Sequence, residues 1–310
     1  MKSSLPKVLH TIGGKSMLQH VIDSAMTLEN SRSHIVIGHG AEAVESALSG
    51  QSVQFALQAE QLGTGHAVAQ AMPNISDNGV VLVLYGDVPL TRPDTMAQLV
   101  KIAERGQFGL LTVNLTDPTG YGRIVRCDAG DVVAIVEHKD ATPEQHLIAE
   151  VNTGIMAMPA KYLNTWLPAL SADNAQGEYY LTDVIAMAVA DGVVVTALQP
   201  TSETEVEGVN DRVQLSRLER IYQRQQAEAL MRGGATLADP ARLDVRGMLT
   251  IGPDLFIDIN AVFEGEVTLG SNVRIGPNVV IRNAHIGDNV VIEANSHLDG
   301  VVIGAYCQIG

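Results

Sequence analysis

Residues 251–286 read IGPDLFIDINAVFEGEVTLGSNVRIGPNVVIRNAHI, and a large apolar side chain returns along this stretch at six-residue steps. A few later steps shorten to five residues, and the pattern continues to residue 309. The recurring residues are Ile251, Ile257, Phe263, Leu269, Ile275, Ile281, Ile286, Ile292, Leu298, Ile303 and Ile309. A second aliphatic set lies four positions after six of these, at Leu255, Ala261, Val267, Val273, Val279 and Val290. This hexapeptide period is typical of a parallel β-helix, in which each repeat forms one short strand and one corner.

Glycine often follows the recurring apolar residue, as at Gly252, Gly270 and Gly276. We expect these glycines to give the corners their unusual backbone conformation. The period-two alternation that a sandwich of amphipathic strands would show is absent. We therefore predict a partial parallel β-helix over residues 234–310.

The segment before the repeats, residues 210–233, has a different pattern. Its apolar residues are spaced as in a helix, and arginine and glutamine crowd the other face. Asn210 is expected to cap the start of this helix, and Gly233 with Gly234 to end it. We interpret the segment as a long surface helix that links two domains.

The first 209 residues alternate β-branched apolar runs with helical periodicity. Predicted strands occupy 34–38, 53–57, 80–86, 108–115, 132–139, 152–158 and 193–198. Helical patterns occupy 16–26, 93–104 and 180–192, and Pro93 suits a first helical turn. This alternation predicts an α/β domain with a mostly parallel sheet. Such sheets bind ligands beyond the carboxyl ends of their strands.

Composition restricts the class of protein further. The 310 residues are 46% hydrophobic and 18% charged, which supports packed cores and excludes a disordered chain. A net charge of −15 disfavours nucleic acid and anionic membranes as standing partners. The two cysteines, Cys127 and Cys307, cannot build a disulfide framework. With no apolar run long enough to span a membrane and no signal-peptide pattern at the start, we expect a cytoplasmic protein.

Polar clusters follow several of the predicted strands. Asp87, in LYGDVPL (84–90), is placed to bind Mg²⁺ together with phosphate oxygens, although a turn aspartate explains it equally well. LQAEQLGTGHA (57–67) could bring backbone N–H groups to an anionic or planar ligand, or could simply begin a helix. Asn152 and Asn210 lie at element edges, where capping is the commoner role. The nine histidines show no metal-site spacing, and no Ser/His/Asp elbow is present.

Taken together, the clusters resemble the bacterial bifunctional N-acetylglucosamine-1-phosphate uridyltransferase/glucosamine-1-phosphate N-acetyltransferase family. The resemblance continues through DPARLDVRG into the repeats and covers essentially the whole chain. One departure is Ser16, where the family usually has proline. The resembling runs are LPKVLHTIGGKSM, LQAEQLGTGHA, LYGDVPL, DPTGYGRI, VEHKDAT, EVNTGIM, NAQGEYYLTD and EVEGVN.

The resemblance implies a Rossmann-like nucleotidyltransferase domain at 1–209, a linker helix at 210–233 and the start of a left-handed β-helix at 234–310. The implied reaction joins UTP and N-acetylglucosamine 1-phosphate into UDP-N-acetylglucosamine and pyrophosphate, for cell-wall and lipopolysaccharide precursors. Mg²⁺ is the implied cofactor and a homotrimer the implied assembly.

Each implied role falls on a matching position of this sequence. Asp87 and Asn210 match the Mg²⁺ ligands, and Lys7 matches a lysine that supports the phosphates. Uracil recognition matches Gln58, Gly63 and Thr64, with Tyr85, Gly86 and Asp87 beside them. The residues that hold the N-acetylglucosamine group match Gly122, Glu137 and Asn152.

Two features of the family have no counterpart here. The Gly-rich loop L-x-x-G-x-G-T-x-M, which cradles the triphosphate, is absent together with the strand before it, and Met1 aligns with the loop's final methionine. We interpret this as an internally assigned start or a shortened gene. Three coils of repeats are too few to include the acetyltransferase residues, so acetyl transfer is not assigned to this chain.

Three functions therefore remain open: the uridyltransferase, a related sugar-1-phosphate nucleotidyltransferase with another base or sugar, and an inactive trimerising fragment. Loss of one preorganised donor costs roughly 10² to 10³ in rate, and loss of a whole phosphate loop should cost more. We expect little or no uridyltransferase activity from the 310 residues as they stand. A turnover assay with UTP and N-acetylglucosamine 1-phosphate that gave normal rates would contradict this expectation.

Overall fold

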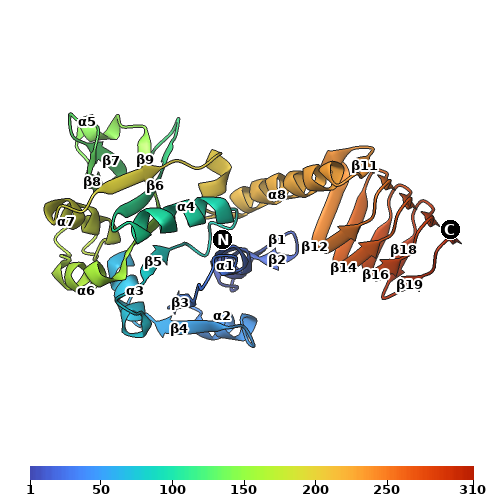
Figure 1. The fold of residues 1–310 in the computed structure, drawn as a ribbon, viewed down its shortest axis with the longest axis horizontal. Helices are drawn as coiled ribbons and strands as arrows, with labels where there is room; N and C mark the ends of the chain where they lie inside the picture. Colours follow the sequence, from blue (N-terminus) through green and yellow to red (C-terminus); the bar gives the residue numbers. More distant parts are fainter. The chain divides into compact units, whose positions relative to one another are not determined.

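The computed structural model describes residues 1–310 and divides into two compact units. Unit 1 contains Met1, residues 10–17 and residues 209–310, and unit 2 contains residues 2–9 and 18–208. Figure 1 shows the elements of both units along the chain. The fold class predicted from the sequence, an α/β nucleotidyltransferase domain followed by hexapeptide coils, is confirmed.

Unit 2 is built on a six-stranded sheet in the order β10-β6-β9-β7-β8, with β5 paired to β9. The strands are β5 (Val80–Val83), β6 (Phe108–Asn114), β7 (Arg123–Arg126), β8 (Val132–Val136), β9 (Glu150–Pro159) and β10 (Val195–Leu198). The helices of the unit are α1 (Met17–Met26), α2 (Ala41–Ala47), α3 (Thr64–Ala71), α4 (Pro93–Glu104), α5 (Pro143–His146), α6 (Ala160–Ala169) and α7 (Val184–Ala190).

Both faces of this sheet are buried. Along β9, Ile155 and Ala157 pack with Leu99 of α4, whereas Met156 and Met158 pack with Trp166 of α6 and with α7. Because successive side chains of a strand point to opposite faces, one apolar run serves two cores. The result is a three-layer arrangement of helices, sheet and helices.

The prediction of a mostly parallel sheet was wrong for β9 and overlooked β7. β9 runs antiparallel to β5, β6 and β7, and β7 forms an antiparallel hairpin with β8. Only β6–β10 and β3–β4 are parallel pairs in this unit. One reason lies in a connection: β7 and β8 are joined by residues 127–131 alone, too few for the crossover that a parallel pair requires.

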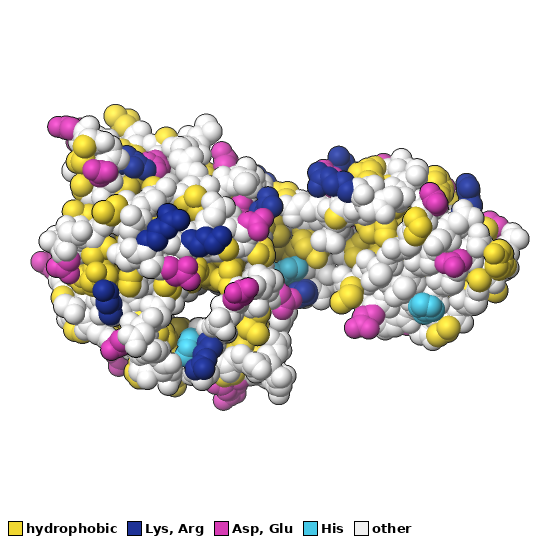
Figure 2. Space-filling view, viewed as in Figure 1, with side chains coloured by type: hydrophobic (Ala, Val, Ile, Leu, Met, Phe, Trp, Pro, Cys, Tyr) yellow, Lys and Arg dark blue, Asp and Glu magenta, His cyan; other side chains and the backbone are white.

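A second, two-stranded sheet of β3 (Ser33–Ile37) and β4 (Val53–Leu57) stands apart from the large sheet. β3 pairs only with β4, and β5 pairs only with β9, so each has one free edge. A cavity of about 1450 Å³ lies between them, lined by apolar side chains that include Ile35, Leu82 and Leu84. It is visible as an opening in the space-filling view (Figure 2).

Unit 1 contains the β-helix, whose coils stack in parallel. One sheet consists of β11 (Thr236–Leu237), β13 (Phe256–Ile257), β15 (Arg274–Ile275), β17 (Val291–Ile292) and β20 (Gln308–Ile309). The other consists of β12 (Leu243–Ile251), β14 (Ala261–Leu269), β16 (Val280–Ile286), β18 (His297–Asp299) and β19 (Val302–Ile303). Val245 aligns with Phe263, and Phe263 with Ile281, so equivalent residues of neighbouring coils stack directly.

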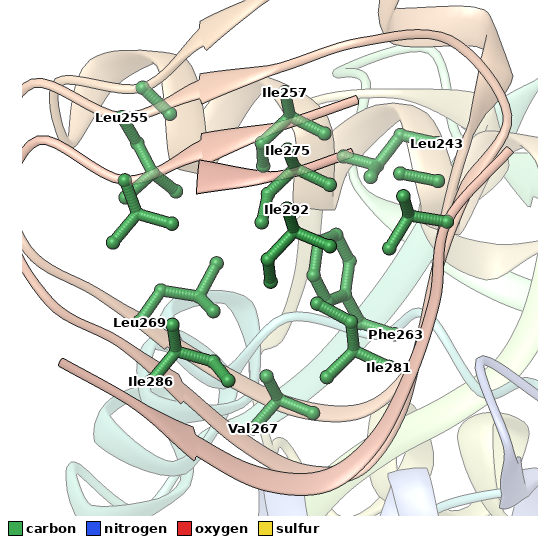
Figure 3. Close-up of a cluster of buried hydrophobic side chains, with 14 of the residues drawn as sticks. Leu243, Leu255, Ile257, Phe263, Val267, Leu269, Ile275, Ile281, Ile286 and Ile292 are labelled. Carbon is green, nitrogen blue, oxygen red and sulfur yellow. The ribbon is translucent and has the colours of Figure 1, made fainter. Parts of the chain in front are cut away.

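The predicted inward positions fill the interior of these coils. Figure 3 shows Ile257, Ile275 and Ile292 in one stack, with Phe263 and Ile281 beside them. All are at most 1% exposed, as is most of the second set of small aliphatics. The hexapeptide interpretation is confirmed residue by residue from Ile257 to Ile292, whereas Ile251 and the last repeats are only partly buried.

Asparagine, more often than glycine, has the left-handed backbone conformation in the coils. Asn260, Asn278 and Asn295 have φ values of 61°, 58° and 64°, and their amides form a ladder with N···O distances of 2.9 and 3.1 Å. Gly276 has a different role, because a Cβ there would lie 2.8 Å from the nitrogen of Ala294 in the next coil. The glycines thus permit close stacking of coils, and our assignment of the corner conformation to them was wrong.

The helix α8 (Arg212–Arg232) confirms the predicted helix, with Gly233 at its end. Its cap was mispredicted: the carboxylate of Asp211, not Asn210, accepts the N–H groups of Val213 and Gln214, both at 2.8 Å. Two short strands, β1 (Thr11–Ile12) and β2 (Lys15–Ser16), form a hairpin on α8, where the N–H of Gly13 donates to Glu219 at 2.7 Å. None of the helices has the length and apolar character needed to cross a membrane.

The asparagine ladder gives a test of the corner geometry. Asn278→Ala should lower the free energy of unfolding of unit 1 by about 1–2 kcal/mol, because alanine is strained at positive φ. Asn278→Gly loses the same amide contacts but tolerates this φ, so its loss should be smaller. Urea unfolding followed by circular dichroism measures both. Equal losses would mean that the amide ladder, and not backbone conformation, is the constraint.

Candidate functional site

Lys7 and Asp87 form one end of the site in unit 2. Lys7 begins a 3₁₀ turn (Lys7–Leu9), and Asp87 follows β5, at the strand end where the sequence placed it. The Nζ of Lys7 lies 2.5 Å from Oδ2 of Asp87. Gly86 lets this turn pack closely, since a Cβ there would lie 3.2 Å from carbons of Val8 and Leu18. The ion pair therefore holds a cation and a carboxylate together at the edge of the sheet.

Tyr85 connects this end to the rest of the site. Burial raises the pKa of Tyr85 to about 12, and the charges of Glu137 and Asp87 add to the rise. Its ring packs against Gly154, where a Cβ would lie 2.5 Å from a ring carbon and where φ is +84°. Gly154 therefore has to be glycine for the tyrosine to stay in place. Tyr85 remains a neutral hydrogen-bonding group between two carboxylates.

The three predicted sugar-binding residues are brought together. Gly122 precedes β7, Glu137 follows β8, and Asn152 lies in β9. The N–H of Asn152 donates to the carbonyl of Gly122 at 2.8 Å. A Cβ on Gly122 would lie 3.3 Å from Oε2 of Glu137, so glycine leaves that carboxylate accessible. These three positions, 30 residues apart in sequence from first to last, therefore share one place in the fold.

Glu137 lies in an electrostatically costly position. Burial raises the pKa of its carboxyl, and Asp183 and Asp140 raise it further. The hydroxyl of Thr182 donates to Oε1 of Glu137 at 3.0 Å and partly offsets this shift. Thr182 was not predicted as a site residue, although it belongs to the NAQGEYYLTD run that carried part of the resemblance. A carboxylate kept charged at such a cost is suited to accept hydrogen bonds from a ligand.

The proposed uracil segment is fixed by backbone contacts. Gly63, with φ +113°, caps α3, and its Cβ would lie 2.6 Å from the carbonyl oxygen of Tyr179. The side-chain amide of Gln58 donates to the carbonyl of Gly63 at 3.0 Å, and the hydroxyl of Thr64 accepts the N–H of Leu181 at 3.0 Å. The segment 57–67 is therefore joined to residues 179–181 as one platform.

The two halves of the site differ in their surroundings. Lys7, Gln58, Thr64, Tyr85 and Gly86 line the cavity between β3 and β5. The sugar-side residues do not line it. The proposed nucleotide half is thus open to a large void, whereas the sugar half is enclosed by the β7–β8–β9 pairing.

The predicted Mg²⁺ ligands belong to different units, Asp87 to unit 2 and Asn210 to unit 1. The two-residue metal site therefore stays a prediction. No group of three or more histidine, cysteine, aspartate or glutamate side chains is placed to hold a metal by itself. Carboxylate and amide oxygens fit the chemistry of Mg²⁺, which commonly takes one or two protein ligands and completes its shell with phosphate oxygens and water.

The amino-acid sequence is similar to two known domain families and to several known proteins. Residues 1–171 match the MobA-like NTP transferase domain, and residues 249–283 match the six-repeat bacterial transferase hexapeptide. The bifunctional protein GlmU of Marinobacter nauticus is 62% identical over 310 residues, which cover all of this chain and 68% of that protein. The GlmU proteins of Pseudomonas entomophila and Burkholderia vietnamiensis are 58% and 56% identical with the same coverage.

The chain belongs to the GlmU family. It spans about two thirds of the length of these GlmU relatives. The family resemblance inferred from the sequence motifs is thereby confirmed, and so is membership of a nucleotidyltransferase enzyme family.

Solved structures support the fold of the first domain. A nucleotidyl transferase from Methanothermobacter matches with a TM-score of 0.51, covering 71% of this chain and 87% of that one. A CMP:2-keto-3-deoxy-manno-octonic acid synthetase complexed with CTP matches with a TM-score of 0.55, covering 73% and 95%. Both are 17% identical to this chain, so the likeness supports the fold assignment and nothing further.

The raised pKa of Glu137 predicts a gain in stability on removing its charge. In the folded chain this carboxyl holds its proton to higher pH than in the unfolded chain, so ionising it opposes folding as the pH rises. Glu137→Gln keeps the acceptor for Thr182 and removes the charge. We expect a higher Tm than wild type at about pH 7 and no difference at about pH 4, where the unfolded carboxyl is also largely protonated. Thermal scans at the two pH values measure this, and an equal difference at both would contradict it.

Proposed function

We propose that this member of the GlmU family contains the binding site for UTP and N-acetylglucosamine 1-phosphate of a Mg²⁺-dependent uridyltransferase. The reaction of such a site forms UDP-N-acetylglucosamine and pyrophosphate. The convergence of Gly122, Glu137 and Asn152 on one place, linked through Tyr85 to the Lys7–Asp87 pair, carries this proposal. These residues come from separate stretches of the sequence, and their proximity supports the proposal.

The chemistry needs positioning more than a base. A phosphate oxygen of the sugar phosphate attacks the α-phosphorus of UTP, the bond to the β-phosphate bridging oxygen breaks, and pyrophosphate leaves with that electron pair. The attacking phosphate is already an anion, so no proton has to be removed first. Lys7 would neutralise charge on the phosphates, and Asp87 would supply a carboxylate ligand for the metal. Mg²⁺, when bound, would screen the phosphate charge and orient the oxygens.

Recognition of the sugar would fall to the enclosed half of the site. The carboxylate of Glu137 can only accept hydrogen bonds when ionised, which suits sugar hydroxyl groups. The Asn152 side chain is partly engaged, because its Oδ1 accepts the N–H of Gly154 at 2.9 Å. The platform formed by Gln58, Gly63 and Thr64 would contact the uracil ring. Trimerisation through the coils, and a role in supplying precursors of the cell wall and lipopolysaccharide, follow from the same family membership.

Ligand binding tests the proposal without requiring turnover. Isothermal titration of the chain with UTP, in the presence and absence of Mg²⁺, should show tighter binding with the metal. Asp87→Asn should remove this Mg²⁺-dependent gain, and the loss of one charged ligand corresponds to roughly tenfold or more in affinity. Asp94→Asn is the matched control, because Asp94 is an exposed aspartate on α4 paired only with Arg92 at 3.5 Å.

Base selectivity separates the proposed function from its nearest alternative. We expect UTP to bind more tightly than CTP or TTP, and N-acetylglucosamine 1-phosphate more tightly than glucose 1-phosphate. Preference for another base would favour a related sugar-1-phosphate nucleotidyltransferase. A trimer that binds neither UTP nor the sugar phosphate would favour a non-catalytic fragment, and light scattering alongside the titrations reports this.

A further inference from the structure

Arg123, the first residue of β7, is buried without a direct ion pair. The residue is 1% exposed and is one of the largest fully buried side chains in the chain. Its Nη1 donates to the carbonyl of Tyr121, its Nη2 lies 3.5 Å from Nδ1 of His138, and its Nε has no partner. It takes part in no ion pair with an aspartate or glutamate. A guanidinium kept in this state opposes folding, because neither its charge nor its donors are fully satisfied.

The neighbouring arginine on the same strand provides the contrast. Arg126 is partly exposed and forms a two-bond contact with Glu150, through Nε at 2.8 Å and Nη2 at 2.7 Å. That pairing satisfies its charge in the ordinary way. Arg123, three residues earlier, contacts only a carbonyl and a histidine ring directly, and the carboxyl of Asp117 interacts with it through charge alone. Stability of the strand alone therefore does not account for a buried arginine at this position.

The strand register at Arg123 shows which residues its neighbours face. Its backbone aligns with Val136 of β8 and with Val151 of β9, both antiparallel. In antiparallel pairing the preceding residue on one strand faces the following residue on the other. Gly122 is thereby directed toward both Glu137 and Asn152, the three residues of the proposed sugar half.

The side chain of Arg123 spans the same junction. Tyr121, which accepts from Nη1, directly precedes Gly122, and His138, next to Nη2, directly follows Glu137. One rigid, planar guanidinium thus contacts the residues that flank the closest approach of Gly122 and Glu137. Its fork geometry can hold two groups in fixed directions at once, which a lysine ammonium on a flexible stem cannot.

We propose that Arg123 is a positioning residue for the sugar half of the site: its buried guanidinium sets the distance between Gly122 and Glu137. It does not itself touch the ligand. The inference rests on the proposed function, since it assigns Glu137 and Gly122 to the sugar phosphate. The uridine platform of Gln58, Gly63 and Thr64 lies on β4 and α3 and has no contact with Arg123.

The test compares two ligands on four chains. Wild type, Arg123→Met, Arg123→Lys and Arg126→Met are titrated calorimetrically with N-acetylglucosamine 1-phosphate and, separately, with UTP. Arg123→Met should weaken sugar-phosphate binding by roughly tenfold, the effect of losing about one charge-assisted hydrogen bond, and leave the Kd for UTP unchanged. Its Tm should not fall, because replacing an unpaired buried charge with an apolar side chain of similar length is often neutral or stabilising.

Arg123→Lys keeps the buried charge and loses the fork, so it should show the same selective loss even if the methionine variant folds poorly. Arg126→Met, the matched control on the same strand, should bind both ligands as wild type does. Wild-type affinity for the sugar phosphate in both Arg123 variants would overturn the inference, as would an equal loss for both ligands. Wild type that binds UTP but no sugar phosphate would overturn the proposed function of the sugar half, and this inference with it.

Discussion

The antiparallel register of β7 against β8 and β9 is the constraint on which the candidate site depends. Arg123 opposite Val136 and Val151 directs Gly122 to Glu137 and Asn152, and the hydrogen bond between Gly122 and Asn152 fixes the junction at 2.8 Å. A slip of one residue would send every side chain of the strand to the opposite face of the sheet. It would also remove Glu137 from the place where glycine leaves room for it. The sugar half is therefore a property of strand pairing rather than of any single loop.

Burial also sets the protonation behaviour of two residues at the candidate site. Burial raises the pKa values of both Tyr85 and Glu137, and the charge of Glu137 adds to the rise at Tyr85. The tyrosine stays neutral, while the carboxylate is held by Thr182 and stays close to Asp140 and Asp183. A ligand that donates hydrogen bonds to Glu137 would stabilise its charged form. Ligand binding would therefore offset part of the cost of burying this charge.

The sequence predicted the periodic parts of the chain well and the pairing of its strands less well. The hexapeptide repeat identified Phe263, Ile275 and Ile281 as interior residues, because a solenoid repeats one local rule. β7 was overlooked since RIVR is too short to stand out, and the direction of β9 is set by its pairing with β5, β6 and β7, which come from distant parts of the sequence. Asp211 replaced Asn210 as the cap because either residue type can serve and only the φ and ψ angles decide. The site residues came from resemblance in sequence; no spacing rule could have placed Arg123 beneath Gly122 and Glu137.

The two proposed halves of the site differ in how the strands around them are paired. Gly122 and Glu137 adjoin the ends of β7 and β8, and Asn152 lies in β9, so the pairing of these strands fixes their positions. Tyr85 and Gly86 follow β5, which is paired on one side only, and Lys7, Gln58 and Thr64 face the same large cavity. β5 therefore has one unpaired edge beside the cavity, whereas β7 is paired on both sides. The proposed sugar half thus depends on more backbone pairing than the proposed phosphate half, so a substitution that weakens the β7–β8 or β7–β9 pairing should affect the first more than the second.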